Sequence, residues 1–277
     1  MIIDSHLHVW SNNVDKFPFQ RGGKPSQDAS AEFLLKTMDD AGVDRAVIVQ
    51  PRNYMYDNRY VAETLKRYPD KFAGVALVDV KSPNAPDTLE DLVRNHGFGG
   101  FRLQMSWETN PLDVAGKDRN ALWSKAEELG VTIIVLGSGL DHSALEPIIE
   151  RFPKVPVVLD HIGGVPIDEE EDQMLRASML RLARFPNVHV KISGMFGKSK
   201  QHYPYHDTWG LVKQTYNAYG PERLMWGSDF PGILGRCTYQ QGLDLVGKEM
   251  NFLNDDDRAW LFEKTVSKLW KFGGSGQ

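Results

Sequence analysis

Apolar residues in this 277-residue chain gather in eight short runs, and each run is followed by a stretch with helical spacing of its apolar positions. The runs are continuous rather than alternating, which is typical of parallel strands buried on both faces. We expect strands at residues 2–9, 45–50, 72–78, 100–104, 131–136, 155–160, 188–192 and 223–226. We expect helices at residues 31–41, 59–68, 86–95, 119–129, 143–151, 170–184 and 205–219, and within 239–270.

Eight strand–helix units in a chain of this length predict an α/β fold, the (β/α)8 or TIM barrel, as a single domain. The predicted barrel covers residues 1–272, and the glycine-rich end, residues 273–277, is expected to be a flexible tail. A doubly wound sheet is the rival fold. It would ordinarily have fewer strands and a glycine-rich phosphate turn, and the chain has no such turn.

Composition narrows the class of protein further. Hydrophobic residues make up 41% and charged residues 25%, with a net charge of −5 and no basic stripe, so we expect no nucleic-acid partner. The single cysteine, Cys237, excludes a disulfide within the chain and favours a reducing compartment. No apolar run approaches the roughly 18 residues of a membrane span. Because residue 2 onwards is predicted to be a strand and no basic region precedes an apolar run, we expect no signal peptide. We therefore expect a cytoplasmic protein that binds a small molecule, and whether it forms a homo-oligomer stays open.

Polar side chains stand at the ends of most of the predicted strands. Because barrel enzymes build their active sites at the carboxyl ends of the strands, these side chains are expected to meet at one mouth. Burying so many ionisable groups is costly unless they are paired or used. The residues are His6, His8, Gln50, Arg102, Gln104, Asp160, His161, Lys191, Ser193, Ser228 and Asp229.

Four of these strand ends carry motifs that resemble the amidohydrolase superfamily. The motifs are His6-Leu7-His8, Asp160-His161-Ile162-Gly163-Gly164, Lys191-Ile192-Ser193-Gly194 and Trp226-Gly227-Ser228-Asp229-Phe230-Pro231. They are most similar to its amidohydrolase-2 branch, which includes sugar lactonases, 2-pyrone-4,6-dicarboxylate lactonase and sulfomuconolactone hydrolase.

The resemblance implies roles for individual residues. His6 and His8 match the histidine pair of the first strand, and His161 matches the histidine of the sixth. Asp229 would be the catalytic general base that deprotonates water, His161 would be catalytic by polarising the scissile carbonyl, and Arg102 would bind a substrate oxygen.

The chain departs from the metal-dependent members at the fifth strand, which those members end with a further histidine. Here that strand ends in Leu136-Gly137, and His142 follows a few residues later. A divalent ion such as Zn²⁺ on His6, His8, His161 and Asp229 would therefore be held less securely. We expect either no cofactor or one divalent cation.

The same residues allow a chemical argument. Ester hydrolysis needs a base for water, donors for the developing oxyanion and groups that orient the substrate. Asp229 and His161 supply the first two needs. For substrate binding we predict His6, His8, Arg102, Gln50, Lys191, Ser193 and Tyr54.

We therefore predict a hydrolase that opens a lactone or activated ester of a small, anionic, oxygenated metabolite. One alternative is a metal-dependent amidohydrolase or non-oxidative decarboxylase of the same superfamily, and another is a non-catalytic ligand-binding barrel. Specificity is expected in the loops at residues 11–30, 51–58, 105–117 and 196–207. Their aromatic residues are candidate pocket walls: Tyr54, Tyr56, Trp107, Phe196 and Tyr203.

Overall fold

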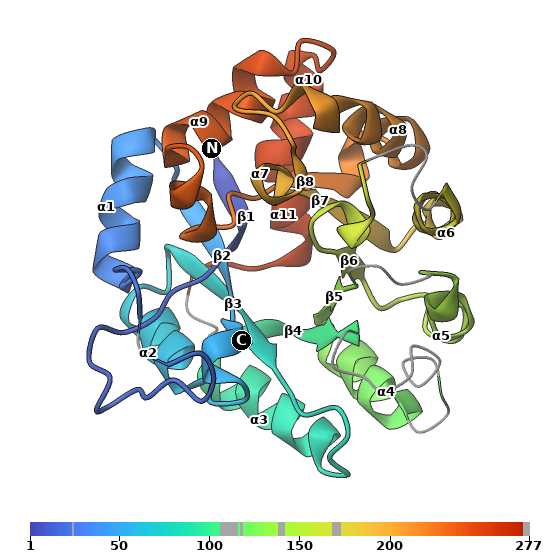
Figure 1. Ribbon diagram of the computed structural model, residues 1–277. Coiled ribbons are helices and arrows are strands. Elements are labelled where there is room, and N and C mark those ends of the chain that lie inside the picture. Colours follow the sequence, from blue (N-terminus) through green and yellow to red (C-terminus); the bar gives the residue numbers. More distant parts are fainter. Residues whose placement is uncertain (24, 106–115, 117–118, 138–141, 168–172, 274–277) are drawn as a thin grey trace.

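The computed structural model describes residues 1–23, 25–105, 116, 119–137, 142–167 and 173–273. Its centre is one sheet of eight parallel strands that follow each other in chain order (Figure 1). The strands are β1 (Ile3–Leu7), β2 (Arg45–Val49), β3 (Phe72–Leu77), β4 (Phe98–Gln104), β5 (Thr132–Leu136), β6 (Val157–Leu159), β7 (Val188–Ile192) and β8 (Leu224–Trp226). The predicted barrel is confirmed.

The sheet curls round until the segment after β8 meets β1. Leu7 and Phe230 form a parallel bridge, and the His8 backbone N–H donates to the Phe230 carbonyl at 2.7 Å. The barrel is thus nearly closed, and the polar residues at its strand ends face one mouth.

Helices surround the sheet (Figure 1). They are α1 (Ala31–Ala41), α2 (Arg59–Arg67), α3 (Ala85–His96), α4 (Asn120–Leu129), α5 (Glu146–Arg151), α6 (Gln173–Arg181), α7 (Met195–Lys198), α8 (Trp209–Tyr219), α9 (Tyr239–Asp244), α10 (Asp255–Ala259) and α11 (Thr265–Leu269). The first of them matches its predicted bounds because the Ser30 side chain caps its start and Gly42, at φ 71°, ends it.

Other bounds differ from the prediction. The first strand ends at Leu7, two residues early, and β6 keeps only three of its six predicted residues. The helix expected to begin at residue 205 begins at Trp209, because a separate turn, His206–Thr208, precedes it. The helical region expected within 239–270 is divided by two π-helical turns, Leu245–Glu249 and Trp260–Lys264.

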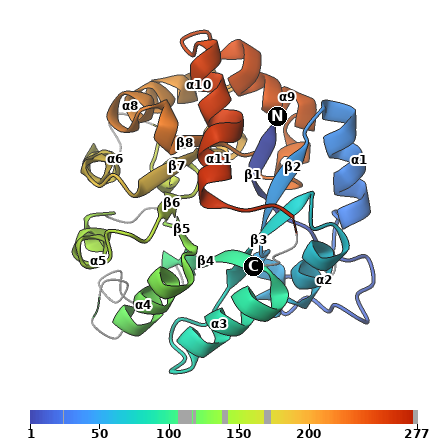
Figure 2. The same cartoon turned by 180° about the vertical axis from the view of Figure 1, so that it is seen from behind.

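Two apolar layers explain why the strands read as continuous runs. On β2, Ala46 and Ile48 pack outwards against the helices, whereas Val47 and Val49 pack into the barrel. The inner layer is completed from α11, which contributes Val266 and the adjoining Trp270 (Figure 2). Each strand is therefore buried on both faces, as parallel strands are. Every described helix is too short or too polar to cross a bilayer.

Candidate active site

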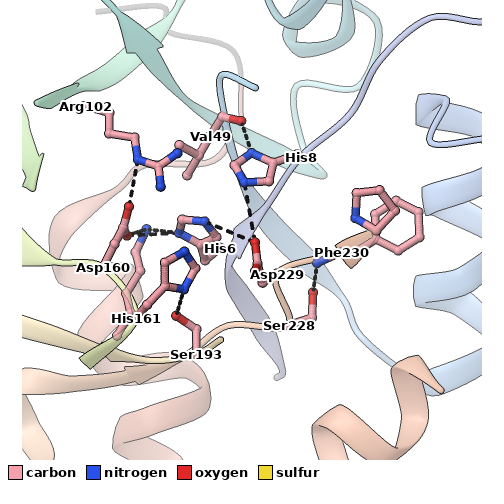
Figure 3. Close-up of polar contacts among 12 residues, drawn as sticks. His6, His8, Val49, Arg102, Asp160, His161, Ser193, Ser228, Asp229 and Phe230 are labelled. Carbon is pink, nitrogen blue, oxygen red and sulfur yellow. Dashed lines mark hydrogen bonds and ion pairs between the residues drawn. The ribbon is translucent and has the colours of Figure 1, made fainter. Parts of the chain in front are cut away.

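Four of the predicted site residues meet at the barrel mouth, and we call them the reactive cluster: His6, His8, His161 and Asp229 (Figure 3). The rings of His6 in β1 and of His8 just after it have centroids 5.0 Å apart, and the ring of His161, which follows β6, lies 4.5 Å from that of His6. The His8 side chain is 17% exposed and that of Asp229 21%, so the cluster is reachable from solvent on one side.

Asp229 follows β8 and points its carboxylate at His6 of β1 and at His8, which follows that strand. Its Oδ1 lies 3.6 Å from His6 Nε2 and 3.5 Å from His8 Nε2. The backbone has φ 60°, the left-handed region that residues other than glycine rarely adopt, and the Asp229 N–H donates to the His6 carbonyl at 2.8 Å. His161 has a similar φ of 53°. Strained backbone of this kind gathers at functional sites, where surrounding contacts hold it.

The charges of the cluster follow from its surroundings. Burial alone would raise the pKa of the Asp229 carboxyl, but His161, His8 and His6 outweigh it and hold that pKa well below its usual range. Burial lowers the pKa of His161 below its ordinary 6.5, although Asp229 and Asp160 oppose that shift. At neutral pH the cluster therefore contains a carboxylate beside a neutral imidazole, a suitable pair for a base and a hydrogen-bond donor.

The Nδ1 atom of each imidazole in the cluster contacts a residue outside the cluster. His8 Nδ1 donates to the Val49 carbonyl at 2.8 Å, which leaves its Nε2 facing Asp229. His161 Nδ1 lies 3.0 Å from Ser193 Oγ. His6 Nδ1 lies 3.0 Å from Asp160 Oδ1. Such partners fix the ring orientation, so the remaining nitrogens face the shared space.

A second group lies deeper, and we call it the buried charge cluster: Arg102, Asp160 and Lys191. Asp160 forms ion pairs with both cations: its Oδ2 lies 3.0 Å from Arg102 Nε and its Oδ1 lies 3.1 Å from Lys191 Nζ, and all three side chains are at most 2% exposed. Burial would raise the pKa of Asp160, but His6, Lys191 and Arg102 hold it well below its usual range. A buried ion is tolerated when it is paired in this way.

Two glycines allow the histidines to sit where they do. A Cβ on Gly194 would lie 2.7 Å from His161 Nδ1, and one on Gly227 would lie 2.7 Å from His6 Cβ. Both distances are too short for a real contact. The ends of β7 and β8 can therefore approach the imidazoles only without side chains at these positions.

Asp4 joins the first strand to the segment that carries Asp229. Its Oδ1 accepts from the backbone N–H groups of His6 and Ser228, each at 3.0 Å, and its Oδ2 accepts from the Tyr239 hydroxyl at 2.8 Å. Burial raises the pKa of Asp4 to about 6. This carboxyl contributes to the geometry of the site without reaching its surface, and the sequence reasoning assigned it no role.

Three residues predicted to bind substrate have other neighbours. Lys191 is fully buried and reaches Asp160 and His6. Tyr54 is also buried, and its hydroxyl accepts the backbone N–H of Ser11 at 2.9 Å, so it supports a loop. The Gln50 side chain donates to the Asp57 carbonyl at 2.8 Å. The structure does not bring Tyr54 and Gln50 into the reactive cluster.

Strand β4 supplies two polar groups with spare hydrogen-bonding capacity. Phe101 and Leu103 pack outwards, so Arg102 and Gln104 face the interior. Both side-chain amide atoms of Gln104 are buried without a hydrogen-bond partner among the described residues. An unmet amide is costly, and such costs are typical of sites that receive a ligand. The sequence reasoning noted Gln104 at a strand end but gave it no function.

Two further candidates have clear surroundings. The Phe196 ring and Asp229 Oδ2 both lie within 4 Å of the position that a Gly232 Cβ would occupy, so this predicted wall residue is near the base. Cys237 lies in an open groove between α1 and residues 234–241, and burial raises the pKa of its thiol. A thiol of that kind is a poor nucleophile. Trp107 and most of the loop at residues 105–117 lie outside the described residues.

The residues present fit a divalent cation. One ligand atom from each of His6, His161 and Asp229 can be chosen so that all lie within 4.8 Å of one another, and His6 Nε2 is buried without a hydrogen-bond partner among the described residues. Three protein ligands of this type are usual in catalytic zinc sites. Among the described residues the fifth strand adds no ligand to these three, although His142 Nε2 lies 3.7 Å from the position that a Cβ on Gly137 would occupy, just after that strand.

Comparison with known proteins agrees with these features. A family model described as Amidohydrolase matches residues 3–272. L-fucono-1,5-lactonase of Burkholderia ambifaria is 29% identical over 237 residues, which are 83% of this chain and 80% of that protein. The 4-sulfomuconolactone hydrolase of Hydrogenophaga intermedia is 27% identical, over 82% of this chain and 74% of its own.

A solved structure shares the fold. The crystal structure of a putative 2-pyrone-4,6-dicarboxylic acid hydrolase from Pseudomonas putida superposes with a TM-score of 0.80 at 23% identity. The match covers 97% of this chain and 96% of that one. The resemblance that the motifs predicted is confirmed.

Proposed function

This chain is a hydrolase of the amidohydrolase family, and we propose that it opens the ring of a small, anionic lactone or cleaves an equally activated ester. The observation that carries the proposal is the convergence of one carboxylate with three imidazoles whose Nδ1 atoms are all engaged elsewhere. The lactone-hydrolysing names of the two relatives support it.

Asp229 is the base in this proposal. It takes a proton from water while the water oxygen attacks the carbonyl carbon. When the ring C–O bond breaks, the same proton passes to the leaving oxygen, so the cycle ends with Asp229 ionised again. The low pKa of Asp229 keeps the carboxylate available at neutral pH.

The oxyanion that forms in this step needs donors. If Ser193 donates its hydroxyl hydrogen to His161 Nδ1, the other nitrogen of His161 carries a proton that it can give to the carbonyl oxygen in a hydrogen bond. A preorganised donor of this kind is worth about 10²–10³ in rate. A lactone or activated ester suits these groups because its alkoxide leaves more readily than an amine.

The proposed anionic character of the substrate is supported by positive charge near the mouth. Burial and the neighbouring guanidinium groups of Arg21 and Arg102 lower the pKa of Arg52, so three like charges lie close together. A substrate carboxylate would be attracted to this positive charge and could pair with the Arg102 guanidinium. Among described residues only Asp160 pairs with Arg102, through Nε, which leaves its terminal nitrogens for a ligand.

A divalent cation, if bound, would be held by His6, His161 and Asp229, with His8 beside them. It would supply Lewis acidity and lower the pKa of a bound water from 15.7 towards about 7. We propose the direct route through Asp229, because the histidine that ends the fifth strand in metal-dependent members is replaced by Gly137.

The reaction class is tested by a substrate panel. Native protein and Asp229→Asn are incubated with sugar lactones, carboxylated pyrones, unactivated amides and hydroxybenzoic acids, and products are separated by mass. We expect ring opening of a carboxylated or polyhydroxylated lactone by the native protein alone. Loss of carbon dioxide or cleavage of the amides would contradict the proposal. Binding of a lactone without turnover would instead establish a ligand-binding barrel.

A further inference from the structure

Three buried polar atoms form a nearly equilateral triangle beneath the reactive cluster. His6 Nδ1 is 3.0 Å from Asp160 Oδ1 and 3.1 Å from Lys191 Nζ, and Lys191 Nζ is 3.1 Å from the same Asp160 oxygen. All three side chains are fully buried. None of these three side chains can therefore replace its contacts with a hydrogen bond to solvent.

The three edges cannot all be good hydrogen bonds at once. The Lys191 ammonium only donates and the Asp160 carboxylate only accepts, so their shared edge is always favourable. His6 Nδ1 carries either a proton or a lone pair. With a proton it donates to Asp160 and faces the Lys191 donors unfavourably; with a lone pair it accepts from Lys191 and faces Asp160 unfavourably.

The other nitrogen of His6 decides between these arrangements. His6 Nε2 lies 3.6 Å from Asp229 Oδ1. A proton on Nε2 points at that carboxylate and leaves Nδ1 free to accept from Lys191. A cation at Nε2 needs the lone pair there, so the proton must move to Nδ1 and the Lys191 hydrogen bond is lost.

We propose that Lys191 is a positioning residue that holds His6 with its proton on Nε2 and thereby opposes the binding of a divalent cation at the reactive cluster. In that state the Nε2–H group of His6 faces the Asp229 carboxylate at 3.6 Å, an electrostatic contact that is longer than a hydrogen bond and needs no metal ion. Lys191 touches neither substrate nor reacting atoms, so its influence on them passes through His6.

Charge balance leads to the same conclusion. Asp160, Asp229 and Asp4 supply up to three negative charges to the barrel interior, and Lys191 and Arg102 supply two positive charges. A divalent cation at His6 Nε2 would place two positive charges close to the buried Lys191 ammonium, where repulsion between like charges is strong. Removal of Lys191 should therefore favour the cation, both by ending its competition for Nδ1 and by removing one positive charge.

Two variants give opposite expectations. For Lys191→Met, Asp160 keeps its Arg102 partner, and the Zn²⁺ affinity measured by titration calorimetry on chelated protein should rise about 10–100-fold, the usual size of outer-shell effects on metal sites. For Asp160→Asn, which weakens the acceptor for an Nδ1 proton, the affinity should fall. Lys125→Met is the matched control, because Lys125 pairs with Glu90 outside the barrel, and it should leave the affinity unchanged.

A purely structural role for Lys191 would lower or preserve metal affinity, and either result would overturn the proposal. The native protein provides a test that does not depend on any variant folding. Nitrogen-15 NMR of labelled histidines should show His6 protonated on Nε2 in the chelated protein and on Nδ1 after Zn²⁺ is added. A proton on Nδ1 in the chelated protein would also overturn it.

One arm of the test rests on the proposed function. In chelated protein, Lys191→Met should reduce the turnover of the lactone that the native protein hydrolyses, and Lys125→Met should not. Unchanged turnover in chelated Lys191→Met would contradict the proposed support of Asp229 by His6. If no lactone is hydrolysed by the native protein, the proposed function fails, whereas the calorimetric and NMR results still decide the role of Lys191.

Discussion

The reactive cluster and the buried charge cluster share one barrel interior but differ in what their charges face. Arg102 and Lys191 both pair with Asp160, and the three side chains are no more than 2% exposed. Asp229 is 21% exposed, and its carboxylate faces imidazole nitrogens at 3.5 and 3.6 Å, which are longer than good hydrogen bonds. Charged side chains that are paired inside the protein contribute to the fold, whereas a carboxylate without close hydrogen-bond partners, such as Asp229, is available to a substrate.

This difference predicts that substitutions in the two clusters differ in their effect on the free energy of unfolding. Changes in the reactive cluster should lower turnover and leave the free energy of unfolding almost unchanged. Changes in the buried charge cluster should lower the free energy of unfolding, because each removal leaves an unpaired ion inside the barrel. His6 contacts both clusters and is expected to show both effects.

The largest effect is expected for Asp229→Asn. An amide of the same shape cannot take a proton from water, so kcat should fall about 10²–10⁴-fold. The change is nearly isosteric, so Tm should move little. Both values come from steady-state assays and a thermal melt. Near-normal turnover would remove Asp229 from the role of base.

The next largest effect is expected for Asp160→Ala. Lys191 and Arg102 would then be buried without their common partner, and the free energy of unfolding should fall by about 3–5 kcal/mol. Urea titration followed by circular dichroism measures this. A loss no larger than that of Asp229→Asn would mean that the two clusters do not differ as described.

His161→Gln should lower kcat about 10²–10³-fold by removing the proposed donor to the oxyanion. KM should change less, because the lost interaction is made mainly in the transition state. Ser193→Ala is the matched variant, since it removes the partner of His161 Nδ1 and keeps the ring. Its effect should be smaller than that of His161→Gln. If both variants instead raised KM by as large a factor as they lowered kcat, His161 would be a substrate-binding residue rather than the donor to the oxyanion.

Asp4 gives a prediction about pH and stability. Its pKa is raised from 3.8 to about 6 in the folded protein, so the proton favours the folded state and that stability is lost as pH rises from about 4 to 6. Relative to Asp4→Asn, the native protein should lose about 3 kcal/mol of unfolding free energy across this range. Unfolding curves at several pH values measure the difference. Parallel pH dependence in the two proteins would exclude the raised pKa.

The pH dependence of turnover provides the mildest test. Activity needs Asp229 ionised and His161 neutral, and the pKa values of both groups are lowered. kcat/KM should therefore be level near pH 7 and decline only as pH falls below 6.5. A decline that begins above pH 7 would show that another group controls the reaction.

The sequence was sufficient for the fold and for the members of the reactive cluster. Apolar runs between turn residues located all eight strands, because a short continuous apolar run is typical of a parallel strand that is buried on both faces. The strand ends then placed His6, His8, His161 and Asp229 at one mouth together with seven other polar residues, and the resemblance to the amidohydrolase motifs singled out these four. Bounds were less accurate where 3-10 or π turns replace regular helix, as around residues 205 and 245, since spacing alone does not distinguish these turns.

Partnerships among buried polar residues could not be predicted from the sequence. Lys191 stands near a strand end like Arg102, yet its ammonium contacts Asp160, which follows the neighbouring strand β6, and His6 of β1. Tyr54 lies in a mouth loop, yet its hydroxyl meets the Ser11 backbone. Such contacts depend on side-chain reach between strands that are distant in the chain, and strand position does not encode them.

We propose above all that Asp229 and the imidazoles around it hydrolyse a lactone without a metal ion. The most direct measurement is the kcat of chelated protein, with its metal content determined in the same sample, before and after one equivalent of Zn²⁺ is added. We predict that kcat with less than about a tenth of an equivalent of metal is already at least half of the highest value reached. An absence of turnover until Zn²⁺ is added would contradict the account.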